Sequence, residues 1–336
     1  MTAMPRAVFA CPGRGAYTAA SLGSLPVRHP WVRRADELRA EMALPSLIEL
    51  DGAGRFDPAL HLLPVHAAPL TWLVSLLDLE RAAADYRPAA VVGNSLGWYT
   101  ALTAAGSLDF DEGFRLVQEL ALLQQEPLPQ DGPGGQVIYP RHDPDWQPDP
   151  ALERAIDAAL HDGGEVFPSV DLGGYVVLAG TETGVGRLLA DLPPVRLGER
   201  MYPLRLARHG PYHTPLVEHV AAAARERLAG LRWRAPEVTL IDGRGARFSP
   251  WSTDPGELAA YTLGAQVVSP YRFDTSIRVA LREYAPDVLV LPGPSNSLGA
   301  IVGQLVVAEG YRGIRSRTDF EAVQSGPEPV VLSMRR

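Results

Sequence analysis

A serine between two glycines is the feature of this sequence that points most clearly to chemistry. Ser95 stands in Gly93-Asn94-Ser95-Leu96-Gly97, after an apolar run that begins at Pro88 and before an apolar stretch that ends at Ala105. The two runs predict a strand and a helix, so the serine hydroxyl would stand exposed at a tight strand-to-helix turn. The helix dipole and free N–H groups there favour an oxyanion. We expect Ser95 to be a nucleophile and the Leu96 N–H an oxyanion donor; the alternative is a structural glycine turn.

A serine hydroxyl needs a base to accept its proton. Two histidines, His209 and His213, come shortly before the predicted helix from Pro215 to Leu228. By residue type and place alone they are nearly equal candidates, and a histidine in a loop is more often structural. All 31 basic residues are arginines, so no lysine can serve as nucleophile or base.

The elements around these residues alternate between strands and helices, which is typical of an α/β protein. Apolar patterns predict strands at residues 7–10, 238–242 and 288–291, and helices at 60–84, 110–125 and 270–284. From about residue 130 the order becomes strand, helix, strand, strand, helix and strand, the last at 195–206, which predicts a ferredoxin-like α+β subdomain. We expect a core of residues 1–129 and 207–324, an inserted subdomain of residues 130–206 and a loose tail at 325–336.

Composition limits the classes of function. The chain has 336 residues, of which 46% are hydrophobic, enough for a sizeable core. Its formal net charge of -8 argues against binding to nucleic acid. No apolar run is long enough to span a membrane, and the start does not resemble a signal peptide. The single cysteine, Cys11, fits a reducing compartment, and the histidines lack metal-ligand spacing. We expect a cytoplasmic monomer without a bound metal.

Five segments together resemble the malonyl-CoA:acyl-carrier-protein transacylase family and the acyltransferase domains of polyketide synthases. They follow the family's order and spacing over residues 7–317: Phe9–Gly15, Val92–Ala101, Tyr212–Val217, Gln266–Pro270 and Leu291–Ser295. The resemblance selects His213 over His209 as the base. It implies an α/β-hydrolase-like core with a parallel sheet and an inserted ferredoxin-like subdomain, which agrees with the pattern of elements.

The resemblance also implies a ping-pong mechanism in fatty acid or polyketide biosynthesis. Ser95 would attack the thioester of acyl-CoA while His213 takes its proton, and the phosphopantetheine thiol of an acyl carrier protein would then collect the acyl group. The backbone N–H groups of Leu96 and Arg14 would hold the oxyanion, and the backbone carbonyl of Gln266 would orient the histidine. Both acyl-CoA and phosphopantetheine are substrates here, and no bound cofactor is expected.

Departures from the family pattern bear on the acyl group. The arginine that holds a malonyl carboxylate in the family aligns with Leu120, which cannot bind a carboxylate. Asn94 replaces a histidine, and Trp98 replaces a glutamate or similar residue. Leu120 and Trp98 together indicate a pocket for a neutral and bulky acyl group, to which Trp98 adds apolar bulk. Arg14 replaces a glutamine. Its guanidinium either points into the acyl pocket in place of the missing arginine or pairs with an acidic neighbour such as Asp171.

Three functions stay open on this basis. The first is a carrier-protein acyltransferase for an acyl group other than malonyl, and the second is a hydrolase that clears acyl groups from carrier proteins. The third is a non-catalytic relative that binds carrier proteins, against which the Ser95 and His213 pair argues. An acidic carrier would dock between the two subdomains, where Arg205 and Arg208 would form a basic rim.

Overall fold

The larger of two lobes is built around a mainly parallel β-sheet. The computed structural model describes residues 4–125, 134–161 and 165–335. In this part of the chain the sheet has the strand order β10-β9-β2-β1-β12-β13. Strand β1 (Arg6–Cys11) pairs in parallel with β2 (Arg87–Gly93) on one side and with β12 (Val288–Leu291) on the other. These strands are apolar runs because helices cover both faces of the sheet.

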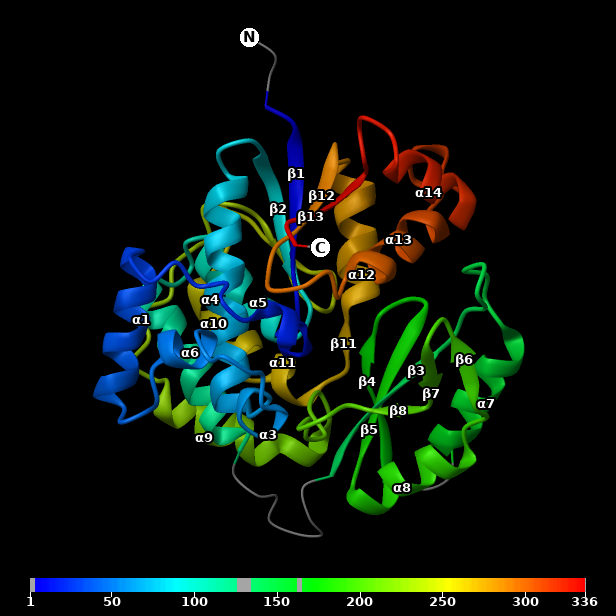
Figure 1. Ribbon diagram of the computed structural model, residues 1–336, viewed down its shortest axis with the longest axis horizontal. Helices are drawn as coiled ribbons and strands as arrows, with labels where there is room; N and C mark the ends of the chain where they lie inside the picture. The colour runs from blue at the N-terminus through cyan, green and yellow to red at the C-terminus, as the bar shows by residue number, and fades with distance from the viewer. Residues whose placement is uncertain (1–3, 126–133, 162–164, 336) are drawn as a thin grey trace.

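The helices around the sheet are arranged in two layers (Figure 1). Helices α4 (Pro64–Ala82), α5 (Leu96–Ala104) and α6 (Phe110–Leu123) pack against one another on one side. Helices α12 (Phe273–Val279) and α13 (Gly299–Ala308) lie on the other side. Further elements of this lobe are α1 (Pro30–Glu41), α2 (Leu47–Asp51), α3 (Pro58–His61), α9 (Glu218–Arg227), β9 (Leu240–Ile241), β10 (Arg247–Phe248), α10 (Pro255–Thr262), α11 (Ala265–Val268) and α14 (Arg317–Gln324).

The smaller lobe has the topology that the sequence predicts. Its sheet order is β11-β4-β5-β3-β8, formed by β3 (Gly135–Pro140), β4 (Val166–Asp171), β5 (Tyr175–Gly180) and β8 (Leu204–Arg205), with β11 (Tyr271–Arg272) at the edge. Neighbours among β3, β4, β5 and β8 are antiparallel, and α7 (Pro150–His161) and α8 (Glu182–Asp191) connect them. This order confirms the ferredoxin-like fold.

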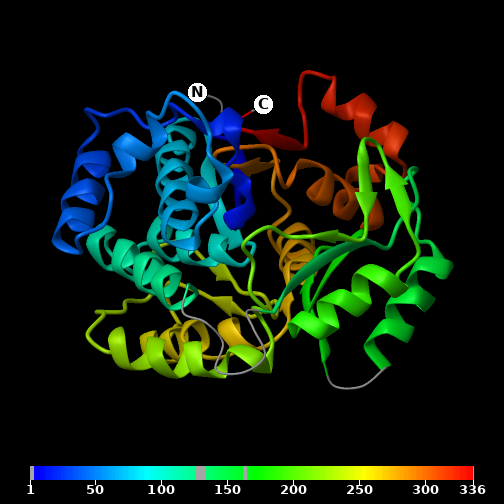
Figure 2. The same ribbon diagram turned by 60° about the horizontal axis from the view of Figure 1, so that its bottom comes forward.

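Backbone pairing joins the two lobes. Strand β11 continues directly into α12 of the larger lobe, yet it pairs in parallel with β4 of the smaller one. Figure 2 shows the smaller lobe, in green, beside the orange and red C-terminal helices of the larger lobe. The hydrogen bonds of this pair therefore hold the smaller sheet against the core at the point where the lobes meet. The domain bounds at residues 130 and 206 stay a prediction.

Two expected elements differ in the structure. The predicted strand at 195–206 is divided into β6 (Val195–Leu197), β7 (Arg200–Tyr202) and β8, because Gly198 adopts φ +60° and turns the chain back on itself. The predicted helix at 270–284 begins as the short strand β11 and becomes helical only at Phe273. The first difference is a local hairpin, whereas in the second the pairing of β11 with the distant β4 overrides the local pattern.

The expected loose tail at residues 325–336 is wrong in its described part. Residues Val331–Ser333 form β13, which pairs in parallel with β12 at the edge of the large sheet. The Arg335 guanidinium then donates to both carboxylate oxygens of Asp78, at 3.0 and 2.8 Å. Asp78 lies on α4 and is only 1% exposed, so its charge depends on this partner. Short segments of this kind carry too little pattern to be predicted as strands.

The described residues also bear on the expectations for membranes and metals. No helix among them is long and apolar enough to cross a membrane. Likewise, no group of three or more histidine, cysteine, aspartate or glutamate side chains in the described ranges is placed to hold a metal ion.

The Asp78–Arg335 pair predicts how firmly the C-terminus is held. Replacing Arg335 by glutamine removes the nearest positive charge from the buried Asp78 carboxylate, and we expect the free energy of unfolding to fall by about 2–3 kcal/mol. Urea denaturation measures this. Arg81→Gln is the matched control, because Arg81 is exposed and makes a longer contact of 3.7 Å with the same carboxylate. This substitution should lower the free energy of unfolding by less than about 1 kcal/mol. Equal losses in the two variants would contradict the expectation.

Candidate active site

Ser95 lies at a sharp turn between β2 and α5. Its backbone adopts φ 53° and ψ -109°, a strained conformation for a residue other than glycine. The flanking glycines are required by packing. A Cβ atom at Gly93 would collide with the backbone of Gly97, and one at Gly97 would collide with the Cys11 carbonyl. The turn therefore presents the Ser95 hydroxyl at the N-terminus of α5, where the sequence placed it.

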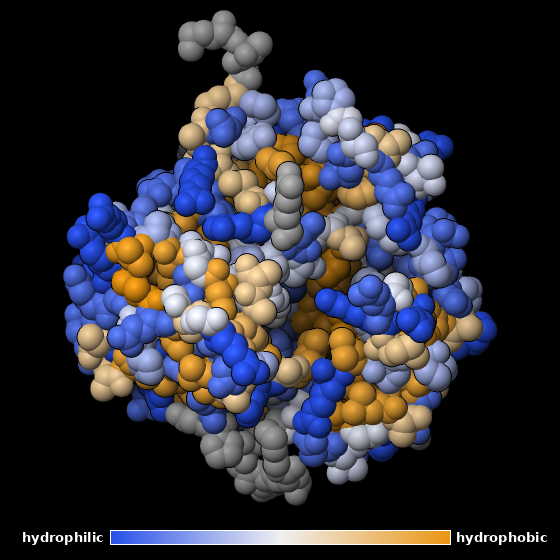
Figure 3. Space-filling model, viewed as in Figure 1, coloured by the Kyte–Doolittle hydropathy of each residue, from blue (hydrophilic) through white to orange (hydrophobic). Residues whose placement is uncertain are grey.

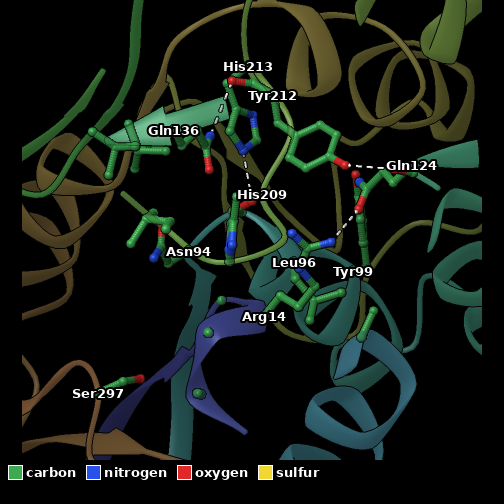
Figure 4. A pocket seen from close by; sticks show the side chains of 18 of the residues that line it. Arg14, Asn94, Leu96, Tyr99, Gln124, Gln136, His209, Tyr212, His213 and Ser297 are labelled. Atoms are coloured by element: carbon green, nitrogen blue, oxygen red, sulfur yellow. Dashed lines mark hydrogen bonds between the residues drawn. The ribbon is translucent and has the colours of Figure 1, made fainter. Parts of the chain in front are cut away.

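His213 bonds both to the serine and to a backbone carbonyl. Its Nε2 is 2.7 Å from Ser95 Oγ, and its Nδ1 is 2.7 Å from the carbonyl oxygen of Gln266. A carbonyl can only accept, so Nδ1 carries the proton and the Nε2 lone pair faces the serine hydroxyl. Figure 4 shows His213 directed into the pocket. This is the hydrogen-bond arrangement of a nucleophile and its base, oriented without a carboxylate.

Gln266 holds the site through its side chain as well. Its amide nitrogen donates to the carbonyl oxygen of Ser95 at 3.3 Å, and its amide oxygen accepts from the Tyr99 hydroxyl at 2.6 Å. Backbone and side chain of one residue thus fix both the histidine ring and the serine turn. The sequence pointed to the backbone carbonyl of Gln266 only, and missed its side chain and Tyr99.

Burial controls the charge of both histidines. It lowers the pKa of His213 to about 4, although the bond to the Gln266 carbonyl acts in the opposite direction. The imidazole is therefore neutral and able to accept a proton at neutral pH. His209 lines the same pocket, but its Nδ1 bonds to the Ala207 carbonyl and it makes no hydrogen bond with Ser95. Burial and the Arg14 charge lower the pKa of His209 to about 3.

The serine opens into a cavity of about 240 Å³ at the junction of the lobes. One wall is formed by apolar residues of α4 and α6: Ala68, Val117, Leu120 and Ala121. The other wall comes from the smaller lobe and α13: Ile138, Val170, Leu172, Val177, Leu298 and Ile301. Figure 3 shows apolar surface, in orange, inside the hollow between the lobes. The cavity can therefore hold an apolar chain beside the nucleophile.

The expected oxyanion donors lie at the edge of this cavity. Leu96 is the first residue of α5, so its N–H has no acceptor within the helix. Arg14 begins the short turn that follows β1, and the elbow is tied to that strand because the Asn94 N–H donates to the Cys11 carbonyl at 2.9 Å. Arg14, Asn94 and Leu96 all line the cavity (Figure 4).

The Arg14 side chain points into the pocket. It is 7% exposed, and its guanidinium donates to Gln124 Oε1 at 3.3 Å and to the Arg208 carbonyl oxygen at 2.7 Å. The same group lies 5.6 Å from the centre of the Tyr212 ring. The expected alternative, a salt bridge with Asp171, is wrong, because that carboxylate pairs with Arg141 at 2.8 Å.

Of two residues expected to line the pocket, Leu120 does so and Trp98 does not. Leu120 is buried in the apolar wall, in the place expected of it. Trp98 is fully buried but does not line the cavity, because its ring packs edge-on against Tyr261 and its Nε1 donates to Thr262 at 3.0 Å. The expectation that Trp98 adds bulk to the pocket is therefore wrong. Neighbouring residues on a helix point in different directions. The sequence alone could not show whether Trp98 lies on the face of α5 that borders the cavity.

Besides Tyr99, three further polar residues of the site were not predicted from the sequence: Gln124, Gln136 and Tyr212. The Tyr212 hydroxyl donates to the Gln124 carbonyl at 3.1 Å, and its own carbonyl accepts from Ser169 at 2.8 Å. Gln136 in turn donates to Ser169 at 2.7 Å. Only Gln124 carried a usable signal, since it lies one helical turn beyond Leu120 on the same face of α6.

Comparison with known proteins gives a consistent result. No protein-family model matches the chain. A malonyl CoA-acyl carrier protein transacylase of Bacillus subtilis is 28% identical over 305 residues, which cover 89% of this chain and 90% of that protein. A crystal structure of the malonyl-CoA:acyl carrier protein transacylase of Xanthomonas oryzae has a TM-score of 0.71 at 25% identity, over 91% of this chain and 92% of that one. Over most of its length, the chain is therefore similar to malonyl-CoA:acyl-carrier-protein transacylases.

Another fold neighbour was solved together with a carrier protein. The complex of a type II polyketide synthase acyl-carrier protein with its malonyl-transacylase has a TM-score of 0.71 at 22% identity, over 90% of this chain and 93% of that one. At that level of identity the likeness concerns the fold of the transacylase chain.

The roles of His209 and His213 can be distinguished by substitution. His213→Ala removes the proton acceptor of Ser95, and we expect acyl-enzyme formation to slow by at least about 1,000-fold. His209→Ala removes a ring from the same cavity without breaking a bond to the serine, and we expect a loss below about tenfold. Stopped-flow or quenched mass spectrometry of the acyl-enzyme measures both rates. A larger loss at His209 would overturn the assignment of the base.

Burial of His213 predicts an unusual pH profile. The pKa near 4 keeps the base form of the imidazole present at higher pH, so the rate should fall only as pH drops through about 4. An exposed histidine would lose activity near pH 6.5 instead. The dependence of kcat/KM on pH measures the value for the free enzyme, with circular dichroism at each pH to confirm that the protein is folded. A midpoint above about pH 6 would contradict this expectation.

Proposed function

We propose that the protein is an acyltransferase that moves an acyl group from acyl-CoA to an acyl carrier protein through a Ser95 acyl-enzyme. The observation that carries the proposal is the continuous hydrogen-bonded chain from Ser95 Oγ through the His213 ring to the Gln266 carbonyl. This chain faces a cavity with apolar walls, which suits an acyl group better than a polar substrate.

Each proton has a place in the reaction. His213 Nε2 takes the proton of Ser95 Oγ as that oxygen attacks the thioester carbonyl, and the imidazolium is stabilised by the Gln266 carbonyl on its other nitrogen. The N–H groups of Leu96 and Arg14 would bind the oxyanion. The C–S bond then breaks, and CoA leaves as a thiol with the proton from His213. In the second half the incoming thiol gives its proton to Nε2, its sulfur attacks the acyl-enzyme, and Ser95 regains the proton.

An acyl carrier protein is the proposed acceptor. Support comes from the family and from the fold neighbour solved with its carrier. Of the two arginines expected at the docking rim, Arg205 is engaged within the chain, because Glu182 accepts two hydrogen bonds from it at 2.6 and 2.7 Å. Arg208 is exposed and lines an adjoining pocket, which shares His209 and Tyr212 with the acyl cavity. We therefore assign the docking charge to Arg208 rather than Arg205.

The nature of the acyl group rests on the residues that face it. Leu120 makes the wall at α6 apolar and, taken by itself, favours an acyl group other than malonyl. Trp98 no longer adds to that argument, since it lies outside the cavity. Among the described residues that line the cavity, Arg14 alone carries a permanent charge. The part of the acyl group beside α6 is therefore proposed to be apolar, whatever group it carries at its end.

One experiment separates transfer from hydrolysis and from binding alone. The protein is mixed with a panel of acyl-CoA thioesters, with and without an acyl carrier protein, and followed by intact mass spectrometry. We expect a Ser95 acyl adduct that disappears as the carrier gains the acyl group, and no adduct in Ser95→Ala. An adduct that decays to free acid at an equal rate without carrier would show a hydrolase. Carrier binding without any adduct would show a non-catalytic relative.

A further inference from the structure

We infer that Arg14 selects acyl groups that end in a carboxylate and holds that carboxylate from the N-terminal loop rather than from α6. The inference rests on the proposed acyltransferase function and names the class of acyl group for the same site. It concerns the guanidinium, whereas the oxyanion role proposed above uses only the Arg14 backbone N–H.

The Arg14 guanidinium is a buried positive charge with neutral partners. It donates to an amide oxygen of Gln124 and to the backbone carbonyl of Arg208, and it lies against the ring of Tyr212. Within the described ranges no carboxylate pairs with it. Burying an unpaired ion is expensive, so a buried arginine is normally matched by an anion. Burial also lowers the pKa of Arg14, which shows how poorly solvated its charge is.

The guanidinium has N–H groups left to donate to an anionic partner. Five N–H groups project from an arginine side chain. Among the described residues, those of Arg14 are engaged by Gln124, the Arg208 carbonyl and the neighbouring Tyr212 side chain, which leaves donors for a further partner. The neighbouring imidazole of His209 adds no competing positive charge, because burial keeps it neutral at physiological pH. A carboxylate entering the cavity would thus meet unused donors in a poorly solvated site, where a charged hydrogen bond is strong.

The position of the charge suits the far end of a short acyl group. Gln124, which contacts the guanidinium, lies four residues after Leu120 on α6, so both residues occupy the same face of the helix. Arg14, Ser95, Leu120 and Gln124 line one cavity. An acyl group bound to Ser95 can therefore run along the apolar α6 wall and place its terminal carboxylate at Arg14.

A purely structural role is the rival explanation. Arg14 joins three segments, because its two hydrogen bonds tie the N-terminal loop to α6 and to the loop before His213. Under that role its loss would slow every thioester alike. The carboxylate role predicts instead that the ratio between a charged and a neutral acyl group changes, and the test is built on that ratio.

The test compares malonyl-CoA with acetoacetyl-CoA, whose terminal ketone has nearly the same shape without the charge. Acyl-enzyme formation on the full chain is followed by intact mass spectrometry. We expect malonyl to react about 10- to 100-fold faster in the unaltered protein, as a charge-assisted hydrogen bond allows. Arg14→Gln should bring the ratio to about one. Gln124→Glu keeps Arg14 but gives it an internal carboxylate, and should also reduce the ratio to about one.

The control and a second readout make the result decisive. Arg115→Gln removes an exposed charge from α6 outside the cavity and should retain the ratio. Titration calorimetry with free malonate measures the anion site without turnover, and Arg14→Gln should abolish that binding. A ratio near one in the unaltered protein, or a ratio that survives both pocket substitutions, overturns the inference. If no thioester acylates Ser95 while malonate still binds through Arg14, the transferase proposal fails and the anion site stands.

Discussion

The hydrogen bond from His213 Nδ1 to the Gln266 carbonyl is the contact on which the site depends. It fixes the tautomer of the ring, and thereby leaves the Nε2 lone pair directed at Ser95. A carbonyl also stabilises the imidazolium that forms when the serine proton is transferred. Because the ring is buried and its partner is uncharged, the resting histidine stays neutral, which a carboxylate partner in the same place would oppose.

This contact constrains the surrounding fold. His213 follows the last strand of the smaller lobe, while Gln266 lies on the short helix α11 of the larger lobe and Ser95 on the elbow after β2. The pairing of β11 with β4 holds the two sheets together only a few residues after Gln266. The same junction creates the acyl cavity, whose walls come from both lobes. Nucleophile, base and pocket are thus consequences of one lobe arrangement.

The charge of the pocket is also a matter of arrangement. An apolar residue on α6 and a basic residue in the N-terminal loop would look unrelated in a linear reading. In the folded protein the Arg14 guanidinium reaches the face of α6 just beyond Leu120. An arginine on α6 or one in the N-terminal loop can therefore place its charge in the same part of the cavity, because the arginine side chain is long.

Local pattern determined the elbow at Ser95, the ferredoxin-like order of the smaller lobe and the central apolar strands, because these follow from periodicity and from glycines that no other residue can replace. Motif order selected His213 and the Gln266 carbonyl. The tertiary structure alone decided the direction of Arg14, the exclusion of Trp98 from the cavity and the pairing of β13 with β12. Each depends on contacts between segments far apart in the chain, and the direction of a side chain or the partner of a short strand is set by what packs against it.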